Sequence, residues 1–144
     1  MKAVDTNLLV YCVSARSSEQ DTALQTLRKL AEGSAPWAIP WSCIYEFLRV
    51  TTHPKVLDPP LSMKQALVFV DALLKSPSLL LLSETDGHAA WLAKAVGEGG
   101  VGGNLVYDAR IAALCYEHGV DTLLTADADF LRFRGLRVVN PFRS

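Results

Sequence analysis

A polar triplet interrupts an apolar stretch in the sequence Lys2-Ala3-Val4-Asp5-Thr6-Asn7-Leu8-Leu9-Val10. The apolar residues before the triplet favour a short strand, and the polar side chains of Asp5, Thr6 and Asn7 break it. The apolar residues that follow, as far as Val13, are expected to form a turn of helix. This succession of strand and helix recurs along the chain.

Four further apolar runs have the length of strands, at 37–40, 78–82, 121–125 and 136–139. Helical spacing of apolar residues predicts helices at Ser17–Gly33, at Cys43–Thr52 after an N-cap at Ser42, at Ser62–Lys75, from Thr85 or Asp86 to Val96, and at Leu105–His118. The glycine-rich segment 97–103 is expected to be a flexible loop, and Gly119 to close the last helix. The alternation predicts an α/β fold with a small, mostly parallel central sheet and helices on both faces. We expect residues 1–144 to form one such domain.

The composition is that of an ordinary globular protein. Of the 144 residues, 50% are hydrophobic and 20% are charged, which argues against disorder. The net charge is -1, so any nucleic acid must be held by a local basic patch or a bound metal rather than by a general field.

The cysteines and the apolar runs bear on the cell compartment. Cys12, Cys43 and Cys115 are dispersed and form no CxxC pair, which argues against a disulfide framework and favours a reducing compartment. The run Leu79–Leu82 is far too short to span a membrane, and polar residues at 5–7 make a signal peptide a poor interpretation. We expect a cytoplasmic protein without membrane contact.

Four carboxylates stand in apolar surroundings, namely Asp5, Glu46, Asp108 and Asp127, and Asp129 follows closely. Burying a carboxylate without a partner costs several kcal/mol or forces protonation. The expected topology brings all four to one end of the sheet, beyond the carboxyl ends of the strands, where ligands bind in such folds. A cluster of carboxylates with no matching Lys or Arg side chains suits Mg²⁺ or Mn²⁺, and the lack of interspersed His and Cys ligands argues against zinc.

Each acid also has a purely structural interpretation. Asp5 would cap the turn after its strand, and Glu46 would face solvent from a helix edge. Asp108 would interact with a helix dipole, and Asp127 and Asp129 would form Asx turns. Only their joint placement favours a shared metal site.

Four segments together resemble the signature of PIN domains, and in particular the VapC-type toxins of prokaryotic toxin–antitoxin pairs. They are Val4-Asp5-Thr6-Asn7, the helical Glu46, Asn104–Leu114 with Asp108, and Thr125-Ala126-Asp127-Ala128-Asp129-Phe130. The resemblance implies a metal-dependent endoribonuclease with a PIN-like three-layer sandwich, usually a homodimer and inhibited by a cognate antitoxin protein. It implies that Asp5, Glu46, Asp108 and Asp127 are the catalytic, metal-binding acids, with Asp5 and Asp108 the most direct ligands. Asp129 matches a common fifth acid, and Thr6, Asn7 and Thr125 match residues that orient the acids or the substrate.

The expected reaction is hydrolysis of an RNA phosphodiester with the help of Mg²⁺ or Mn²⁺. Other residues have two interpretations each. Trp37 and Trp41 would stack bases or pack in the core, and the C-terminal Arg132, Arg134, Arg137 and Arg143 would grip phosphates or a partner, or form a solvated edge. His88 and His118 are expected to face solvent.

Three rival functions deserve comparison. A receiver-like signalling domain needs an acid pair after the first strand and a late lysine, but Asp5 has no adjacent acid and no lysine follows Lys94. A DNA flap nuclease needs additional DNA-gripping elements for which the chain is short. A catalytically idle RNA-binding scaffold is disfavoured by the complete set of acids.

Overall fold

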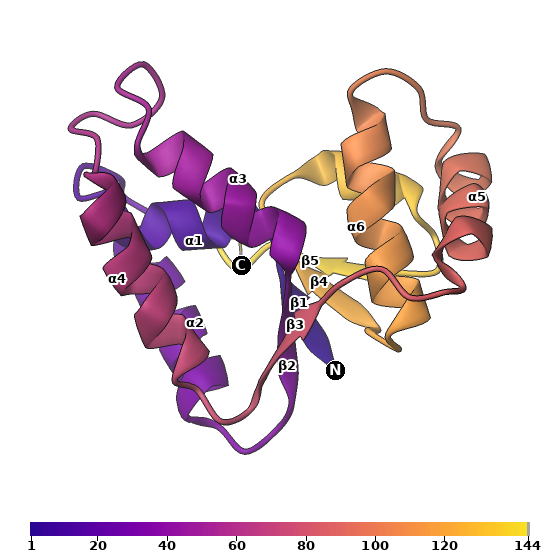
Figure 1. Ribbon diagram of the computed structural model, residues 1–144, viewed down its shortest axis with the longest axis horizontal. Helices are drawn as coiled ribbons and strands as arrows, with labels where there is room; N and C mark the ends of the chain where they lie inside the picture. The colour runs from indigo at the N-terminus through magenta and orange to yellow at the C-terminus, as the bar shows by residue number, and fades with distance from the viewer. Residues whose placement is uncertain (144) are drawn as a thin grey trace.

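The computed structural model describes residues 1–143, in which five parallel strands form one sheet (Figure 1). The strands are β1 (Lys2–Val4), β2 (Trp37–Pro40), β3 (Leu79–Leu82), β4 (Thr122–Leu124) and β5 (Arg137–Val139), in the spatial order β3-β2-β1-β4-β5. All four strand pairings are parallel. The predicted α/β class is therefore confirmed, and the sheet is parallel throughout rather than mostly so.

Helices cover both faces of the sheet. They are α1 (Thr6–Val13), α2 (Gln20–Glu32), α3 (Trp41–Thr51), α4 (Met63–Leu74), α5 (His88–Gly99) and α6 (Leu105–Glu117), with a 3-10 helix, η1, at Ala128–Arg132. The chain adds strands in one direction from β1 to β3 and then crosses back to β4. Because crossovers are right-handed, α1–α4 lie on one side of the sheet and α5 and α6 on the other (Figure 1).

This reversal of direction places a topological switch point between β1 and β4, where ligands bind in open parallel sheets. The carboxyl end of β1 leads into Asp5, and that of β4 leads into Thr125. Both strands are held by a buried core that includes Trp37, Ile39 and Leu123. The site is thus built on rigid central strands.

Several local expectations were wrong. Helix α3 begins at Trp41 directly after Pro40, so Ser42 lies inside the first turn and is not its N-cap. Helix α5 begins at His88, later than expected, because Thr85 uses its hydroxyl to accept the amide of Gly87 instead of capping the helix directly.

The glycine-rich segment is also more ordered than predicted. Gly97–Gly99 belong to α5, and the chain turns only at Gly100, whose φ of 58° ends the helix in the left-handed region. Gly119, with φ 71°, follows α6 as expected. Trp37 is fully buried in the core, which confirms its packing interpretation. Within residues 1–143, no helix has the length and apolarity needed to cross a bilayer.

Candidate active site

Asp5 is a buried carboxylate whose two oxygens are both hydrogen-bonded. It is 5% exposed and forms the N-cap of α1, where Oδ1 accepts the amide of Thr6 at 2.7 Å. Its Oδ2 accepts the hydroxyl of Thr125 at 2.8 Å and the side-chain amide of Asn7 at 3.1 Å. Burial raises the pKa of Asp5, although the hydrogen bonds from Thr125 and Thr6 act in the opposite direction. These neutral donors fix the orientation of the carboxylate without a cation.

Asn7 and Thr125 join the chain segments that follow β1 and β4. The side-chain amide of Asn7 donates to Thr125 Oγ1 at 2.9 Å, and its carbonyl accepts the amide of Ala126 at 3.1 Å. The same Thr125 oxygen accepts the amide of Asp127 at 3.0 Å. Asp127 in turn accepts the amide of Asp129 at 2.9 Å and caps η1. The polar residues after the two strands therefore hold each other in place.

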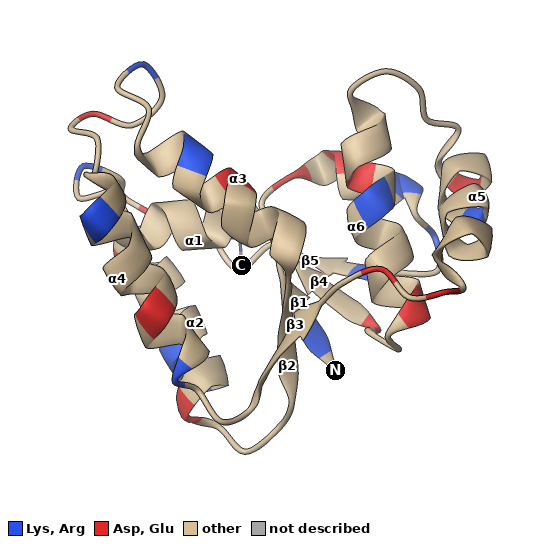
Figure 2. Ribbon diagram, in the orientation of Figure 1, with Lys and Arg blue, Asp and Glu red and all other residues tan. Residues whose placement is uncertain are grey.

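Three carboxylates gather closely at this end of the sheet. One oxygen each from Asp108, Asp127 and Asp129 lies within 4.8 Å of the others. Figure 2 shows the acidic segments on α3, on α6 and after β4 near one another at the same end of the molecule. Among residues 1–143, the sole ion pair of this trio is a long one of 4.0 Å between Asp129 and Arg132.

The crowding changes the acidity of Asp108. Its pKa is raised to about 6, first because the carboxyl is partly buried and then because Asp127, Asp5, Asp129 and Glu46 are negatively charged neighbours. Asp108 lies in the first turn of α6, where the helix dipole favours a negative charge by about 0.3–1 kcal/mol. Burial and repulsion outweigh this gain, so the charged cluster lacks compensation from the protein itself.

A cleft of about 620 Å³ opens between α1, α3 and α6, and all four predicted acids line it: Asp5, Glu46, Asp108 and Asp127. Thr6 and Asn7 also line the cleft. Glu46 is exposed on α3 and accepts the hydroxyl of Thr6 at 3.3 Å. The structure therefore brings the predicted acids to one cleft, with Asp108, Asp127 and Asp129 as the most compact group.

The donor set suits a hard divalent cation. Carboxylate oxygens are the ligands that Mg²⁺ and Mn²⁺ prefer. The nearest thiol belongs to Cys43, whose sulphur lies 3.7 Å from Asp5 Oδ1. Burial, and then the charge of Asp5, raise the pKa of this thiol well above its ordinary value, so it donates to Asp5 as a neutral group and does not act as a thiolate ligand.

The cleft also contains residues that the sequence analysis did not single out. Arg49 and Tyr107 line it together with Tyr11. The sequence could have placed both residues near the site. Arg49 lies three residues after Glu46 on the same helix, and Tyr107 immediately precedes Asp108. Of the four C-terminal arginines, Arg132 donates hydrogen bonds to the backbone carbonyl groups of Gly99 and Asp129.

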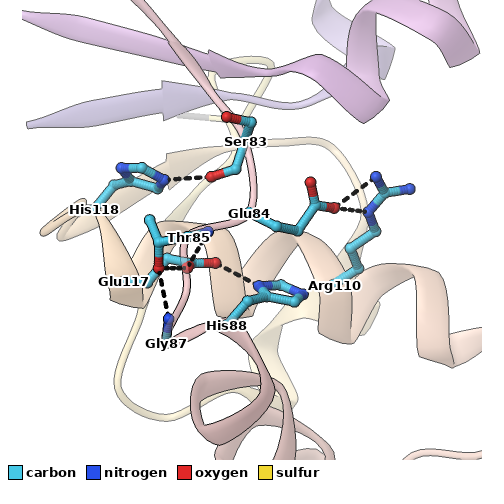
Figure 3. A network of polar contacts seen from close by, with 8 residues as sticks. All are labelled: Ser83, Glu84, Thr85, Gly87, His88, Arg110, Glu117 and His118. Atoms are coloured by element: carbon cyan, nitrogen blue, oxygen red, sulfur yellow. Dashed lines mark hydrogen bonds and ion pairs between the residues drawn. The ribbon is translucent and has the colours of Figure 1, made fainter.

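A second polar cluster lies at the other end of α6 (Figure 3). The side chain of Glu117 is 1% exposed and accepts hydrogen bonds from the hydroxyl and amide of Thr85 and from the His88 ring. His118 binds the carbonyl of Ser83 at 2.7 Å. The expectation that the histidines face solvent was wrong for His88, whose side chain is 17% exposed and joins α5 to α6. His118 is half-exposed, and its ring also contacts the segment after β3.

Comparisons with known proteins agree with this geometry. The PIN domain family model matches residues 2–136. Ribonuclease VapC37 of Mycobacterium tuberculosis is 35% identical over 141 residues, which cover 98% of this chain and 97% of that protein. Ribonuclease VapC48 of the same organism is 29% identical over 138 residues, which cover 96% of this chain and 95% of that protein.

Two solved structures share the fold at low sequence identity. VapBC2 from Rickettsia felis, bound to a DNA fragment from its promoter, has a TM-score of 0.69 at 20% identity and covers 96% of this chain and 97% of that chain. FitAcB from Neisseria gonorrhoeae has a TM-score of 0.68 at 20% identity and covers both chains completely. With its sequence matched by the family model over residues 2–136 and a ribonuclease relative 35% identical along nearly its full length, the protein belongs to the PIN-domain family and, within it, to the VapC ribonucleases.

Proposed function

We propose that this protein is a metal-dependent endoribonuclease that hydrolyses RNA phosphodiester bonds and serves as the toxin of a type II toxin–antitoxin system. The observation that carries the proposal is the compact group of Asp108, Asp127 and Asp129, whose negative charges are not balanced by close basic side chains within residues 1–143. This group stands at the topological switch point of a VapC-type chain. Such a group needs a cation, and a cation bound there meets the phosphate of a substrate in the cleft.

In this proposal Asp5, Glu46, Asp108 and Asp127 hold Mg²⁺ or Mn²⁺. The bound ion supplies a water of lowered pKa and offsets the negative charge that develops on the phosphate oxygens. Thr6, Asn7 and Thr125 keep the carboxylates oriented through the hydrogen bonds described above.

Asp129 has two possible tasks in this scheme. It completes the compact trio as a further oxygen ligand, or it takes the proton of the attacking water together with Asp127. No side-chain nucleophile is required.

The proposal extends to partners and location. We expect a single PIN domain that forms a homodimer, a cognate antitoxin protein that inhibits it, and action in the cytoplasm, where RNA substrates are found. Family membership supports the antitoxin, and one solved structure of the same fold is a toxin–antitoxin complex from Klebsiella pneumoniae with a TM-score of 0.65 at 19% identity. The three cysteines are buried and free, as suits a reducing compartment.

The test is cleavage of matched single-stranded RNA and DNA by the purified protein with Mg²⁺ or Mn²⁺, and again after EDTA. We expect metal-dependent cleavage of RNA, and loss of at least about 100-fold in Asp108→Asn because an amide is a poor ligand for these ions. Asp71→Asn, at an exposed acid on α4, is the matched control and should keep full activity. Cleavage that survives EDTA, or wild-type rates in Asp108→Asn, would contradict the proposal, and equal cleavage of DNA would contradict its RNA specificity.

A further inference from the structure

A second hollow, of about 440 Å³, lies beside the acid cleft between α3 and α6. One wall is a single face of α3, formed by Ser42, Tyr45 and Arg49 at helical spacing. The facing wall comes from α6 and contains Tyr107 and Arg110. We call this hollow the tyrosine groove.

The tyrosine groove is continuous with the acid cleft. Glu46, Arg49, Tyr107 and Ile111 line both hollows. A linear ligand whose phosphate lies against the acids therefore extends directly into the groove. This continuity distinguishes the groove from the apolar surface between α2 and α4, which does not reach the acids.

The two tyrosines leave large aromatic surfaces uncovered. Tyr45 is 70% exposed and Tyr107 is 69% exposed, and the ring of Trp41 lies beside that of Tyr45 at a centroid distance of 6.5 Å. Exposed aromatic rings beside a groove are the platforms on which proteins stack the bases of single-stranded nucleic acids. A base has a flat face whatever its sequence, so two such rings suit a substrate of mixed sequence.

The groove also offers a cation for a phosphate. Arg49 is exposed and makes no ion pair or side-chain hydrogen bond with any residue in the described part of the chain, 1–143. Arg110 differs, because its guanidinium is held by Glu84 at 2.7 Å (Figure 3). Arg49 is therefore the positive charge at the junction of groove and cleft that remains available to a ligand.

Ser42, in the wall of the groove, carries a polar atom without a partner among the described residues. Its hydroxyl is buried without a hydrogen-bond partner, and no other side-chain polar atom within residues 1–143 is in that position. A buried hydroxyl without a partner costs about 1–3 kcal/mol. A rotation of the Ser42 side chain that brought its hydroxyl to a ligand in the groove would recover part of that cost.

We propose that the tyrosine groove binds the nucleotide adjacent to the scissile phosphate of single-stranded RNA. The base stacks on Tyr45 and Tyr107, and Arg49 contacts a backbone phosphate at the junction with the acid cleft. This inference rests on the proposed ribonuclease function and adds to it the residues that recognise the substrate.

The test measures RNA binding apart from cleavage. In an Asp108→Asn background, a fluorescently labelled single-stranded RNA of mixed sequence is titrated with protein and followed by anisotropy. Tyr45→Ala and Tyr107→Ala should each weaken binding about ten-fold, because each removes a stacking platform. Tyr45→Phe and Tyr107→Phe keep the aromatic ring and should bind the RNA about as tightly as the Asp108→Asn protein. Val106→Ala, an exposed neighbour on α6 outside the groove, is the control and should not change the affinity.

Arg49 gives a readout of a different kind. Arg49→Ala should weaken binding and reduce the slope of log affinity against log salt by about one, as expected for the loss of one phosphate contact. In cleavage assays of proteins with Asp108 intact, the tyrosine variants should raise KM more than they lower kcat.

The outcomes separate this inference from the proposed function. If wild type cleaves RNA but both tyrosine-to-alanine variants bind and cleave like wild type while melting normally, the groove inference is wrong and the nuclease function stands. If those variants lose only the binding of a co-expressed antitoxin protein, the groove is a protein interface and the inference is again wrong. If wild type neither cleaves nor binds RNA, both proposals are wrong.

Discussion

The Thr125 hydroxyl donates a 2.8 Å hydrogen bond to Asp5 Oδ2 and so connects the ends of two adjacent strands that are 120 residues apart in sequence. The same oxygen accepts the side-chain amide of Asn7 and the backbone amide of Asp127. A hydroxyl has one donor hydrogen and two acceptor lone pairs, so Thr125 uses its full capacity. Thr125 therefore links Asp5 directly to Asp127, in addition to the contacts that Asn7 makes between the same two segments.

Thr125→Val should impair both the site and the fold, because valine keeps the shape and loses all three hydrogen bonds. We expect a stability loss of about 1–3 kcal/mol and a fall in kcat of ten-fold or more, since the buried partners are left unpaired. Thr125→Ser, which restores the hydroxyl, should recover most of the activity. Urea unfolding and single-turnover RNA cleavage measure the two effects. If valine supported wild-type kcat, Thr125 would be only a core residue.

The fold was largely predictable because its signals are local. Each strand is a short apolar run between turn residues, and a parallel sheet follows from strands separated by helices. The helix starts were less predictable, because capping depends on tertiary contacts. Thr85 interacts with Glu117, which is 32 residues away, and α5 therefore begins at His88 rather than at Thr85 or Asp86.

The acids were predictable because they break apolar patterns, yet their structural interpretations also hold. Asp5 does cap α1, Asp127 does cap η1, and Asp108 does lie in the first turn of α6. Capping orients the carboxylates of Asp5 and Asp127 and does not exclude ligation. The tyrosine groove was not predictable in this way, because exposed Tyr45 and Tyr107 resemble ordinary surface residues until α3 and α6 are placed side by side.

No cysteine should take part in the reaction. Burial raises the pKa of both Cys12 and Cys115 to about 12, so neither is a thiolate near neutral pH. Replacing Cys12 or Cys115 with Ala should leave kcat/KM within a few-fold of wild type, and Cys43→Ala should do so after correction for the folded fraction. Complete loss of activity in a folded, metal-replete variant would reveal a thiol mechanism.

The second polar cluster, in which Thr85 and His88 bind Glu117, should stabilise the fold without contributing to cleavage. Burial raises the pKa of Glu117, but hydrogen bonds from Thr85 and His88 outweigh burial and hold the pKa below its ordinary value. The stabilisation is therefore present above the ordinary pKa of 4.5 and is lost as pH falls through the lowered folded-state pKa.

Glu117→Gln should cost about 1–3 kcal/mol near neutral pH, because it weakens a buried, charge-assisted network. The control is Glu32→Gln, which disrupts an exposed pair with Arg28 at 4.0 Å and should cost no more than about 0.5 kcal/mol. Urea unfolding measures both changes, and kcat of the folded variant should equal that of wild type. Equal stability of the two variants would mean that the cluster adds nothing beyond a surface contact.

The pH dependence of the metal-free protein should reveal the crowding of the acids. The pKa of Asp108 is 3.8 in the unfolded chain and about 6 in the folded protein, so the folded state binds more protons between these values. The free energy of unfolding must then fall as pH rises through this window and level off above it. The raised pKa of Asp5 adds to the same trend.

Asp108→Asn should remove much of this fall in the free energy of unfolding with pH. The metal-free variant should be about 0.5–2 kcal/mol more stable than wild type at neutral pH, because the substitution deletes one of the repelling charges. Thermal melting in EDTA from pH 4.5 to 7.5 measures the slope for wild type, Asp108→Asn and the control Asp71→Asn, which should behave like wild type. Millimolar Mg²⁺ at pH 7.5 should raise the Tm of wild type and of the control more than that of Asp108→Asn, because the ion binds only the folded arrangement of acids. If Mg²⁺ shifts no melting curve and Asp108→Asn merely destabilises the protein, these acids are helix caps and the proposed metal site does not exist.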